Sequence, residues 1–237
     1  MVKKIKIKGT IISNDVQWIY DLFDIEATSP NVVADALESA GNEDVEVIIN
    51  SGGGDVFAGS EIYTELKSYA GNVTTKVVGI AASAASVIAM AGKKVQISPT
   101  AQIMIHNVSS RAAGDYRDLQ HEADVLKNYN KSIANAYMIK SGMKEEELLE
   151  LMNKETWFNA QQALENKLAD EIMFEDQLQF SASIGNSPML PQQVIDTIRN
   201  MKDKFSPVAS IEESKSDILM EQKTKLNLLK LKGDVKS

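Results

Sequence analysis

Residues 45–54, VEVIINSGGG, join a short apolar strand to a run of glycines, and this stretch decides the fold class. A helix is predicted directly after it, over residues 56–69, with Gly71 just beyond its end. Residues 73–92 repeat the plan with a β-branched strand at 73–78, a tight turn at 79–82 and a short helix at 83–91. Strands that alternate with helices predict parallel pairing and right-handed crossovers, and therefore an α/β fold.

The alternation continues on both sides of this stretch. Upstream, alternating Ile and Lys predict a strand over residues 3–12, and Ser29 with Pro30 opens a helix that runs to about residue 39. Between them we expect an irregular but anchored segment with side chains available for packing: Trp18, Ile19, Tyr20, Leu22 and Phe23. Downstream, the other predicted elements are strands at 95–97, 103–106 and 168–172 and helices at 114–141, 144–153 and 160–166.

The chain divides into a compact domain and a tail. The domain is expected to span residues 1–178. Residues 179–210 are rich in Ser, Pro, Asn and Gln and are typical of a linker, and residues 211–237 are strongly charged, with leucines on a possible helix. Two interpretations of the tail stay open: a segment that is flexible alone and orders on a partner, and a helix that packs on its own domain.

Composition excludes several classes of function. The net charge of −8 over 237 residues argues against a general binder of nucleic acid or membrane surfaces. The absence of cysteine excludes disulfides, thiolate metal ligands and a cysteine nucleophile, and it suits a reducing cytoplasm. The longest apolar run, residues 77–92, is interrupted by Gly79, Ser83 and Ser86, and the N-terminus has no apolar signal segment. We therefore expect a soluble protein that is not exported.

The glycines at 52–54 allow a ligand to approach backbone N–H groups between a strand and a helix. Such N–H groups can hold an anion or a developing oxyanion. A phosphate loop would need Gly-Lys-Ser/Thr after its spacer, and no Lys follows Gly54; the spacing of a dinucleotide-binding loop is also missing. A flexible turn is the structural alternative.

Ser83 is the candidate nucleophile. Small residues flank it on both sides, which leaves room for a substrate backbone, and the apolar helix that follows is typical of a rigid, buried support. The alternative is that Ser83 only caps the helix. Ser86 is a second candidate, but it lies one turn inside the helix and is expected to face the packing.

His106 is the candidate base because it ends an apolar strand, where an imidazole can project into a cleft. The other histidine, His121, lies among Gln120, Glu122 and Asp124 on the long predicted helix and is expected to be solvated. A histidine at a strand end can also be purely structural. A serine nucleophile with an imidazole base would need a carboxylate to fix the tautomer of the ring.

Taken in order, three segments are similar to the signature blocks of the ClpP serine peptidases. They are Asn50-Ser51-x-Gly53-Gly54-x-Val56, Ala82-Ser83-Ala84-Ala85 and Met104-Ile105-His106. The resemblance covers about residues 3–175. It implies an α/β fold of the ClpP/crotonase type, a spiral of βαβ units with a protruding handle helix at 114–141, followed here by the charged C-terminal tail. It implies that Ser83 is the nucleophile and His106 the base.

The resemblance also implies the rest of the site. Residues 154–160, KETWFNA, match the family block that carries an Asp, and alignment on the aromatic pair and Ala160 puts Glu155 at that position. A Glu can orient a histidine, although its longer arm needs compensation. The backbone N–H groups of Gly54 and Ala84 carry over as oxyanion donors, and Asp170 is given a structural role. No cofactor and no metal ion are implied.

A narrower resemblance points to ClpP-like proteases encoded beside phage and prophage capsid genes. It rests on Trp18-Ile19-Tyr20, on residues 27–30, on Glu155-Thr156-Trp157 and on the Leu-Lys-rich residues 228–233. It implies a prohead maturation protease that acts on a capsid or scaffolding protein in the cytoplasm of the bacterial host. Family members form rings of six or seven subunits that meet through the handle. An unfoldase partner is not expected, because the chain starts almost at its first strand, without the axial-pore loop segment.

Three alternatives remain open at the level of sequence. A crotonase-type acyl-CoA enzyme would share the fold and the paired N–H groups but would work with carboxylates. A catalytically silent relative would serve in capsid assembly, an interpretation that the Glu at position 155 keeps alive. A Ser–Lys mechanism would use Lys93 or Lys94 as the base and leave His106 idle.

Overall fold

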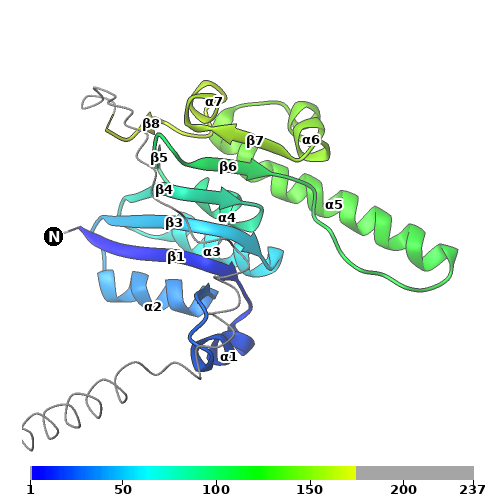
Figure 1. Ribbon diagram of the computed structural model, residues 1–237, viewed down its shortest axis with the longest axis horizontal. Coiled ribbons are helices and arrows are strands. Elements are labelled where there is room, and N and C mark those ends of the chain that lie inside the picture. The colour runs from blue at the N-terminus through cyan, green and yellow to red at the C-terminus, as the bar shows by residue number, and fades with distance from the viewer. Residues whose placement is uncertain (1, 175–237) are drawn as a thin grey trace, which may run out of the picture. The chain divides into compact units, whose positions relative to one another are not determined.

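The computed structural model of the protein describes residues 2–174, whose strands join in one sheet of order β2-β1-β3-β4-β5-β8, with β6 joined to β4 and β7 to β6 (Figure 1). The strands are β1 (Lys3–Ile11), β2 (Ala27–Thr28), β3 (Val45–Gly54), β4 (Val73–Ala82), β5 (Lys94–Ile97), β6 (Gln102–Ile105), β7 (Thr156–Asn159) and β8 (Glu171–Ile172). The helices are the 3-10 turn η1 (Asn14–Val16), α1 (Gln17–Leu22), α2 (Pro30–Ala40), α3 (Val56–Ser68), α4 (Ala84–Ala89), α5 (Tyr116–Ser141), α6 (Glu145–Asn153) and α7 (Ala160–Glu165).

Strand β4 lies at the centre of the sheet and pairs with two strands along the same edge. Its first half pairs with β5 from Thr74 to Val77, and its second half pairs with β6 from Ile80 to Ala82. The described strands pair in parallel, apart from β6 and β7, which pair antiparallel. The predicted α/β class with a parallel sheet is therefore confirmed, and the fork in β4 brings the end of β6 to the end of β4.

The core lies between the sheet and helices α2, α3 and α4, which also contact one another (Figure 1). In β1 the isoleucines Ile5 and Ile7 are buried while Lys4 and Lys6 are exposed, as the alternation of the strand requires. Helix α4 is apolar all round and entirely buried, as expected from its sequence. A rigid, buried element therefore supports the residues at its N-terminal end.

Helix α5 leaves the body of the domain as the predicted handle, and Figure 1 shows it extending to the right of the sheet. Asp115 begins it with a capping box, and Gly142 ends it with a left-handed backbone at φ 75°. Its last turns are anchored by buried side chains, Tyr137 among them, whereas Tyr116 and Leu119 near its start are exposed. The fully buried residues of this helix therefore all lie in its second half.

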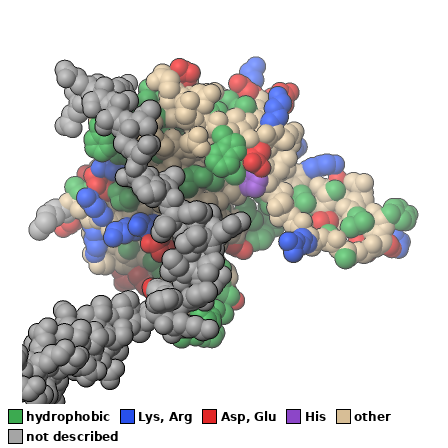
Figure 2. Space-filling model, viewed as in Figure 1, with side chains coloured by type: hydrophobic (Ala, Val, Ile, Leu, Met, Phe, Trp, Pro, Cys, Tyr) green, Lys and Arg blue, Asp and Glu red, His purple; other side chains and the backbone are tan. Residues whose placement is uncertain are grey.

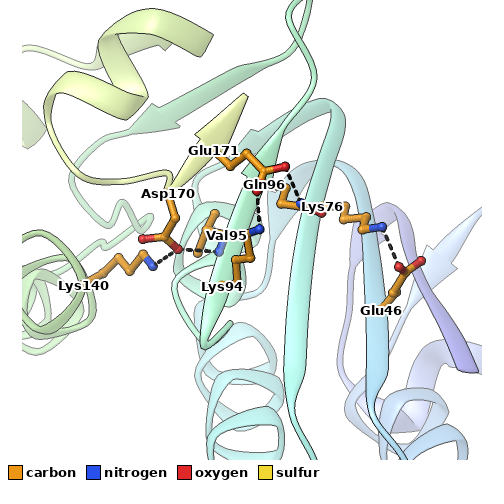
Figure 3. A network of polar contacts seen from close by, with 8 residues as sticks. All are labelled: Glu46, Lys76, Lys94, Val95, Gln96, Lys140, Asp170 and Glu171. Atoms are coloured by element: carbon orange, nitrogen blue, oxygen red, sulfur yellow. Dashed lines mark hydrogen bonds and ion pairs between the residues drawn. The ribbon is translucent and has the colours of Figure 1, made fainter. Parts of the chain in front are cut away.

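Ion pairs and hydrogen bonds stabilise the edge of the sheet formed by β5 and β8 (Figure 3). The carboxylate of Asp170 accepts from the N–H of Val95 at 2.6 Å and from the ammonium of Lys140, whose side chain is only 9% exposed. Glu171 pairs with Lys94 and accepts from Gln96 in the same region. The predicted structural role of Asp170 agrees with these contacts, which tie α5 to strand β5.

One local prediction was wrong, and the prediction that Ser29 and Pro30 open a helix was confirmed without a side-chain capping bond. Residues 79–82 are not a tight turn but the second half of β4, because they pair with β6 instead of reversing the chain. The side chain of Ser29 does not cap α2; its hydroxyl is buried without a partner in the described part of the chain. Residue 29 still ends the extended backbone before the helix, at φ −105° and ψ 164°.

The segment 13–28 is also different from expectation. It forms η1 and α1, and its large side chains do not pack on the body: Trp18, Leu22 and Phe23 are 64%, 70% and 65% exposed. Hydrophobic side chains gather over α1 in the space-filling view (Figure 2). A six-residue helix between two strands of the same sheet edge is too short to bury both of its faces.

The predicted domain boundary at residue 178 and the predicted linker and tail at 179–237 lie outside the described residues. Within residues 2–174 no helix is long and apolar enough to cross a membrane.

Candidate active site

Ser83 is the single residue between the end of β4 and the start of α4. Its backbone has φ 55° and ψ −126°, a combination that costs energy for any residue with a Cβ atom. A hydrogen bond from the N–H of Ser83 to the carbonyl of Met104, at 3.0 Å, fixes this turn to β6. Strain held in place by surrounding structure is common where a side chain must be presented to a ligand.

His106 follows β6 directly, and its ring meets Ser83. The distance from His106 Nε2 to Ser83 Oγ is 2.7 Å, a hydrogen bond of ordinary length. The contact depends on the β4–β6 ladder, in which Ala82 lies opposite Met104, one residue before the serine and two before the histidine. The structure therefore brings together the two side chains that the sequence singled out.

The glycine-rich end of β3 lies against the same turn. Gly53 has φ 90°, and a Cβ atom there would lie 2.6 Å from the carbonyl oxygen of Ala82 and 3.0 Å from the nitrogen of Ala84. Gly54 has φ 151°, and a Cβ atom on it would lie 2.1 Å from the carbonyl oxygen of Ile11. Gly53 therefore allows β3 to approach the start of α4, and Gly54 allows it to approach β1, more closely than a residue with a Cβ atom would.

A cavity of about 300 Å³ opens beside the Ser83–His106 pair. The larger part of its lining is apolar and comes from the start of α3, from α4, from residues 106–109 and from the handle: Val56, Phe57, Val87, Val108 and Ile133. Asp55, Asn107 and Ser109 add polar side chains to the same lining. The ring of Phe57 packs edge-to-face on Tyr129 of α5, with 5.3 Å between centroids. The sequence did not indicate the residues of this cavity, because its walls come from four separate segments of the chain.

The pairing of β7 with β6 brings the backbone of Glu155 near that of His106, but the side chain of Glu155 contacts a different residue. In the β6–β7 ladder Ile105 lies opposite Thr156, so continuing the antiparallel register by one residue sets Glu155 opposite His106. The carboxylate is exposed and accepts a hydrogen bond from the indole N–H of Trp157 at 3.2 Å. Among the described residues no hydrogen bond joins Glu155 to His106.

The competing candidates lie elsewhere. Ser86 is fully buried and bonds the carbonyl of Ser83 and the hydroxyl of Tyr137. Lys93 donates to Asn72, and Lys94 pairs with Glu171 at the far edge of the sheet, so neither ammonium contacts Ser83. His121 is exposed on α5. Within residues 2–174 no three acidic or histidine side chains are grouped as a metal site would require.

This arrangement can carry out nucleophilic acyl transfer. A hydroxyl hydrogen-bonded to a ring nitrogen is the geometry of a serine activated by a general base. The backbone at Gly53 lies against the turn that carries Ser83 and Ala84, and backbone amides beside a nucleophile are groups that can receive negative charge. The apolar cavity beside them can hold one side chain of an acyl group.

Comparison with known proteins supports the same chemistry. A family model described as Clp protease matches residues 26–176. The chain is 31% identical over 135 residues to an ATP-dependent Clp protease proteolytic subunit of Bacteroides fragilis, a match that covers 56% of this chain and 65% of the relative. It is 31% identical over 162 residues to proteolytic subunit 1 of Chlamydia muridarum, covering 66% and 78%. The chain thus spans just under two thirds of the length of the Bacteroides relative.

Proposed function

The chain belongs to the Clp protease family, and we propose that it is a serine endopeptidase in which Ser83 is the nucleophile and His106 the general base. The single observation that supports this proposal most strongly is the 2.7 Å hydrogen bond between His106 Nε2 and Ser83 Oγ. An acyl-CoA hydratase of the same fold would have no use for this pair, because it works with carboxylates.

The reaction runs in two halves. Ser83 Oγ attacks the carbonyl carbon of the scissile bond while its proton passes to His106 Nε2. The N–H groups of Gly54 and Ala84 stabilise the oxyanion of the tetrahedral intermediate. The imidazolium then gives its proton to the leaving amine, and an acyl-enzyme remains on Ser83. Water, deprotonated by His106, attacks the ester, and the carboxylic acid leaves as Ser83 recovers its proton.

Glu155 is the residue that we assign to orient the histidine. The support is that the last pair of the β6–β7 ladder, Ile105 with Thr156, directly adjoins both His106 and Glu155, and that the φ of 49° at Glu155 marks a bend in the backbone there. When the carboxylate exchanges its contact with Trp157 for the Nδ1–H of His106, it holds the ring in the tautomer that leaves Nε2 free to accept a proton.

A serine-directed fluorophosphonate tests the proposal, together with hydrolysis of a fluorogenic peptide. The wild-type protein is expected to be labelled and active, whereas Ser83→Ala and His106→Ala each lose both label and activity. Ser60→Ala, at an exposed serine of α3, serves as the control that keeps both. A folded wild-type protein that takes no label contradicts the proposal and favours a silent or acyl-CoA-type relative; a fully active His106→Ala favours a lysine base.

The finer assignment is to prohead maturation. We infer that the natural substrate is a capsid or scaffolding protein of a phage or prophage, that the enzyme acts in the cytoplasm of the bacterial host, and that it works as a homo-oligomeric ring. The support is the likeness of residues 18–20, 155–157 and 228–233 to the phage-encoded members. Purified enzyme should cut such a capsid protein at a defined position, and a capsid protein left intact by an enzyme that hydrolyses peptides would contradict this assignment alone.

A further inference from the structure

Two buried hydroxyl groups stand behind the nucleophile and have no part in the proposed reaction. Tyr137, near the end of α5, is 1% exposed, and Ser86, in α4, is fully buried. Their oxygens are 2.7 Å apart, and Ser86 Oγ donates to the carbonyl oxygen of Ser83 at 2.6 Å. The hydroxyl groups therefore form a chain that starts on the handle helix and ends on the backbone of the nucleophile.

The direction of this chain follows from the number of protons. A carbonyl oxygen only accepts, so the one proton of Ser86 goes to Ser83. Tyr137 must then be the donor to Ser86 Oγ. Burial raises the pKa of Tyr137 above its usual value, which keeps the phenol protonated and able to donate.

The peptide unit that receives these bonds is the one that matters for catalysis. The carbonyl of Ser83 and the N–H of Ala84 belong to the same planar amide. A hydrogen bond accepted by the carbonyl polarises this amide and makes its N–H a stronger donor. The carbonyl also accepts from the N–H groups of Ser86 at 2.9 Å and Val87 at 3.3 Å, so the hydroxyl provides the shortest of its bonds.

The same bonds hold the plane of the amide. The orientation of this peptide is set by ψ of Ser83, which is −126° in a sparsely populated region of backbone space. A strained torsion persists only where several contacts over-determine it. Ser86, itself held by Tyr137, is one of these contacts, because it bonds the carbonyl end of the amide.

We propose that Tyr137 and Ser86 are positioning residues that orient and polarise the Ser83–Ala84 peptide as an oxyanion donor. This inference rests on the proposed function, since it assigns a task to two residues that touch neither substrate nor Ser83 Oγ. It makes the handle helix a part of the catalytic apparatus: α5 determines the strength of an N–H group on α4.

The test begins with Tyr137→Phe, which removes only the phenol oxygen. We expect kcat to fall about tenfold, less than the hundredfold or more that follows loss of an oxyanion donor, with KM unchanged. The inhibition constant of a peptide boronate, whose oxygen occupies the oxyanion site, should rise by the same factor by which kcat/KM falls. The inhibition constant of a non-reactive peptide competitor should not move.

Thr75→Val is the matched control. Thr75 is fully buried and donates its hydroxyl to the carbonyl of Ala89, at the other end of α4, at 2.8 Å. The Thr75→Val substitution therefore removes a comparable buried hydrogen bond and leaves the hydrogen bonds from Tyr137 to Ser83 intact. Its melting temperature should fall like that of Tyr137→Phe, while kcat stays within about twofold of wild type.

The double variant Ser86→Ala/Tyr137→Phe distinguishes a hydrogen-bonded chain, in which Tyr137 acts through Ser86, from two residues that affect kcat independently. In a chain, Tyr137 acts only through Ser86, so the double variant should be no slower than Ser86→Ala. It should also be at least as stable, because Ser86→Ala alone leaves a buried phenol without a partner. Additive losses in kcat, or a Tyr137→Phe variant with wild-type kcat, overturn the inference. Wild-type protein that takes no fluorophosphonate label contradicts the proposed function instead, and that result precedes any variant.

Discussion

Gly53 and Gly52 stand next to each other in sequence but in different surroundings. A Cβ atom at Gly53 would meet the backbone of Ala82 and the side chain of Ser83 at 2.6 and 2.8 Å, whereas one at Gly52 would meet nothing within 4 Å. Gly53→Ala is therefore expected to lower the free energy of unfolding by about 2 kcal/mol and to lower kcat at least about a hundredfold by displacing the turn. Gly52→Ala should match wild type in thermal melting and in hydrolysis; equal losses in both variants would contradict this reading.

Glu155 carries a second prediction at the scale of one residue. Glu155→Gln keeps the shape and the bond to Trp157 but cannot stabilise an imidazolium, so kcat is expected to fall by about 10³–10⁴-fold. Glu155→Asp, which restores the side chain common in the family, should retain most of the activity. Steady-state kinetics with one peptide substrate compares the variants. Unchanged cleavage by Glu155→Gln would remove Glu155 from the triad and leave the Ser83–His106 assignment untouched.

The sequence indicated those candidate site residues that are recognisable from their immediate neighbours in the chain. Ser83 stands out because only small residues surround it, and His106 because it ends an apolar strand. The direction of the Glu155 side chain could not be predicted in this way. It depends on the indole of Trp157, whose position follows from the pairing of β7 with β6.

At the scale of the element, Phe57 at the start of α3 forms one wall of the cavity and also contacts Tyr129 of the handle. Phe57→Ala removes this wall and its contact with Tyr129, so the cavity should accept larger side chains. In a library of peptides that vary at the residue before the scissile bond, kcat/KM for bulky aromatic residues is expected to rise about tenfold relative to small ones. Phe23→Ala, at an equally exposed phenylalanine that does not line the cavity, should leave the preference unchanged. An unaltered preference in Phe57→Ala would show that the cavity does not receive this side chain.

The junction of α5 with the sheet gives a prediction on stability. Asp170→Asn leaves the ammonium of Lys140, 9% exposed, without its carboxylate partner, and should lower the free energy of unfolding by about 2–3 kcal/mol. Lys140→Met should cost less, because Asp170 keeps its bond to the N–H of Val95. Lys94→Met breaks the exposed pair with Glu171 and is expected to cost under about 1 kcal/mol. Urea denaturation checks this order, and equal values for all three would refute it.

Periodic patterns predicted most elements, because side chains on one face of a strand or helix are buried together. These patterns gave wrong or no predictions where pairing with a strand distant in sequence determines the local structure. Residues 79–82 look like a turn, yet they pair with β6 as a strand. No strand was predicted for β7, because its four residues are too few to show a pattern and its pairing with β6 is antiparallel. The exposure of Trp18 on α1 was missed because a cluster of aromatic and aliphatic residues normally indicates burial.

At the scale of the whole molecule, the first half of the handle exposes Tyr116 and Leu119, which are 80% and 47% exposed. If rings of the enzyme meet through this helix, Leu119→Glu should separate them, since a carboxylate cannot be buried there without a partner. Native mass spectrometry should then show half the wild-type mass, with an unchanged circular dichroism spectrum. Ile139→Glu, 70% exposed near the other end of α5, is the comparison and should keep the wild-type mass. An unaltered mass for Leu119→Glu would contradict contact through the first half of the handle.

The ladder between β4 and β6 has a consequence for the life of a newly made chain. Hydroxyl and imidazole lie on separate strands, and three residue pairs with one further backbone bond hold them in register. Until this pairing has formed, the hydroxyl of Ser83 has no imidazole beside it to accept its proton. The nucleophile can therefore be activated only after two strands that are distant in sequence have paired.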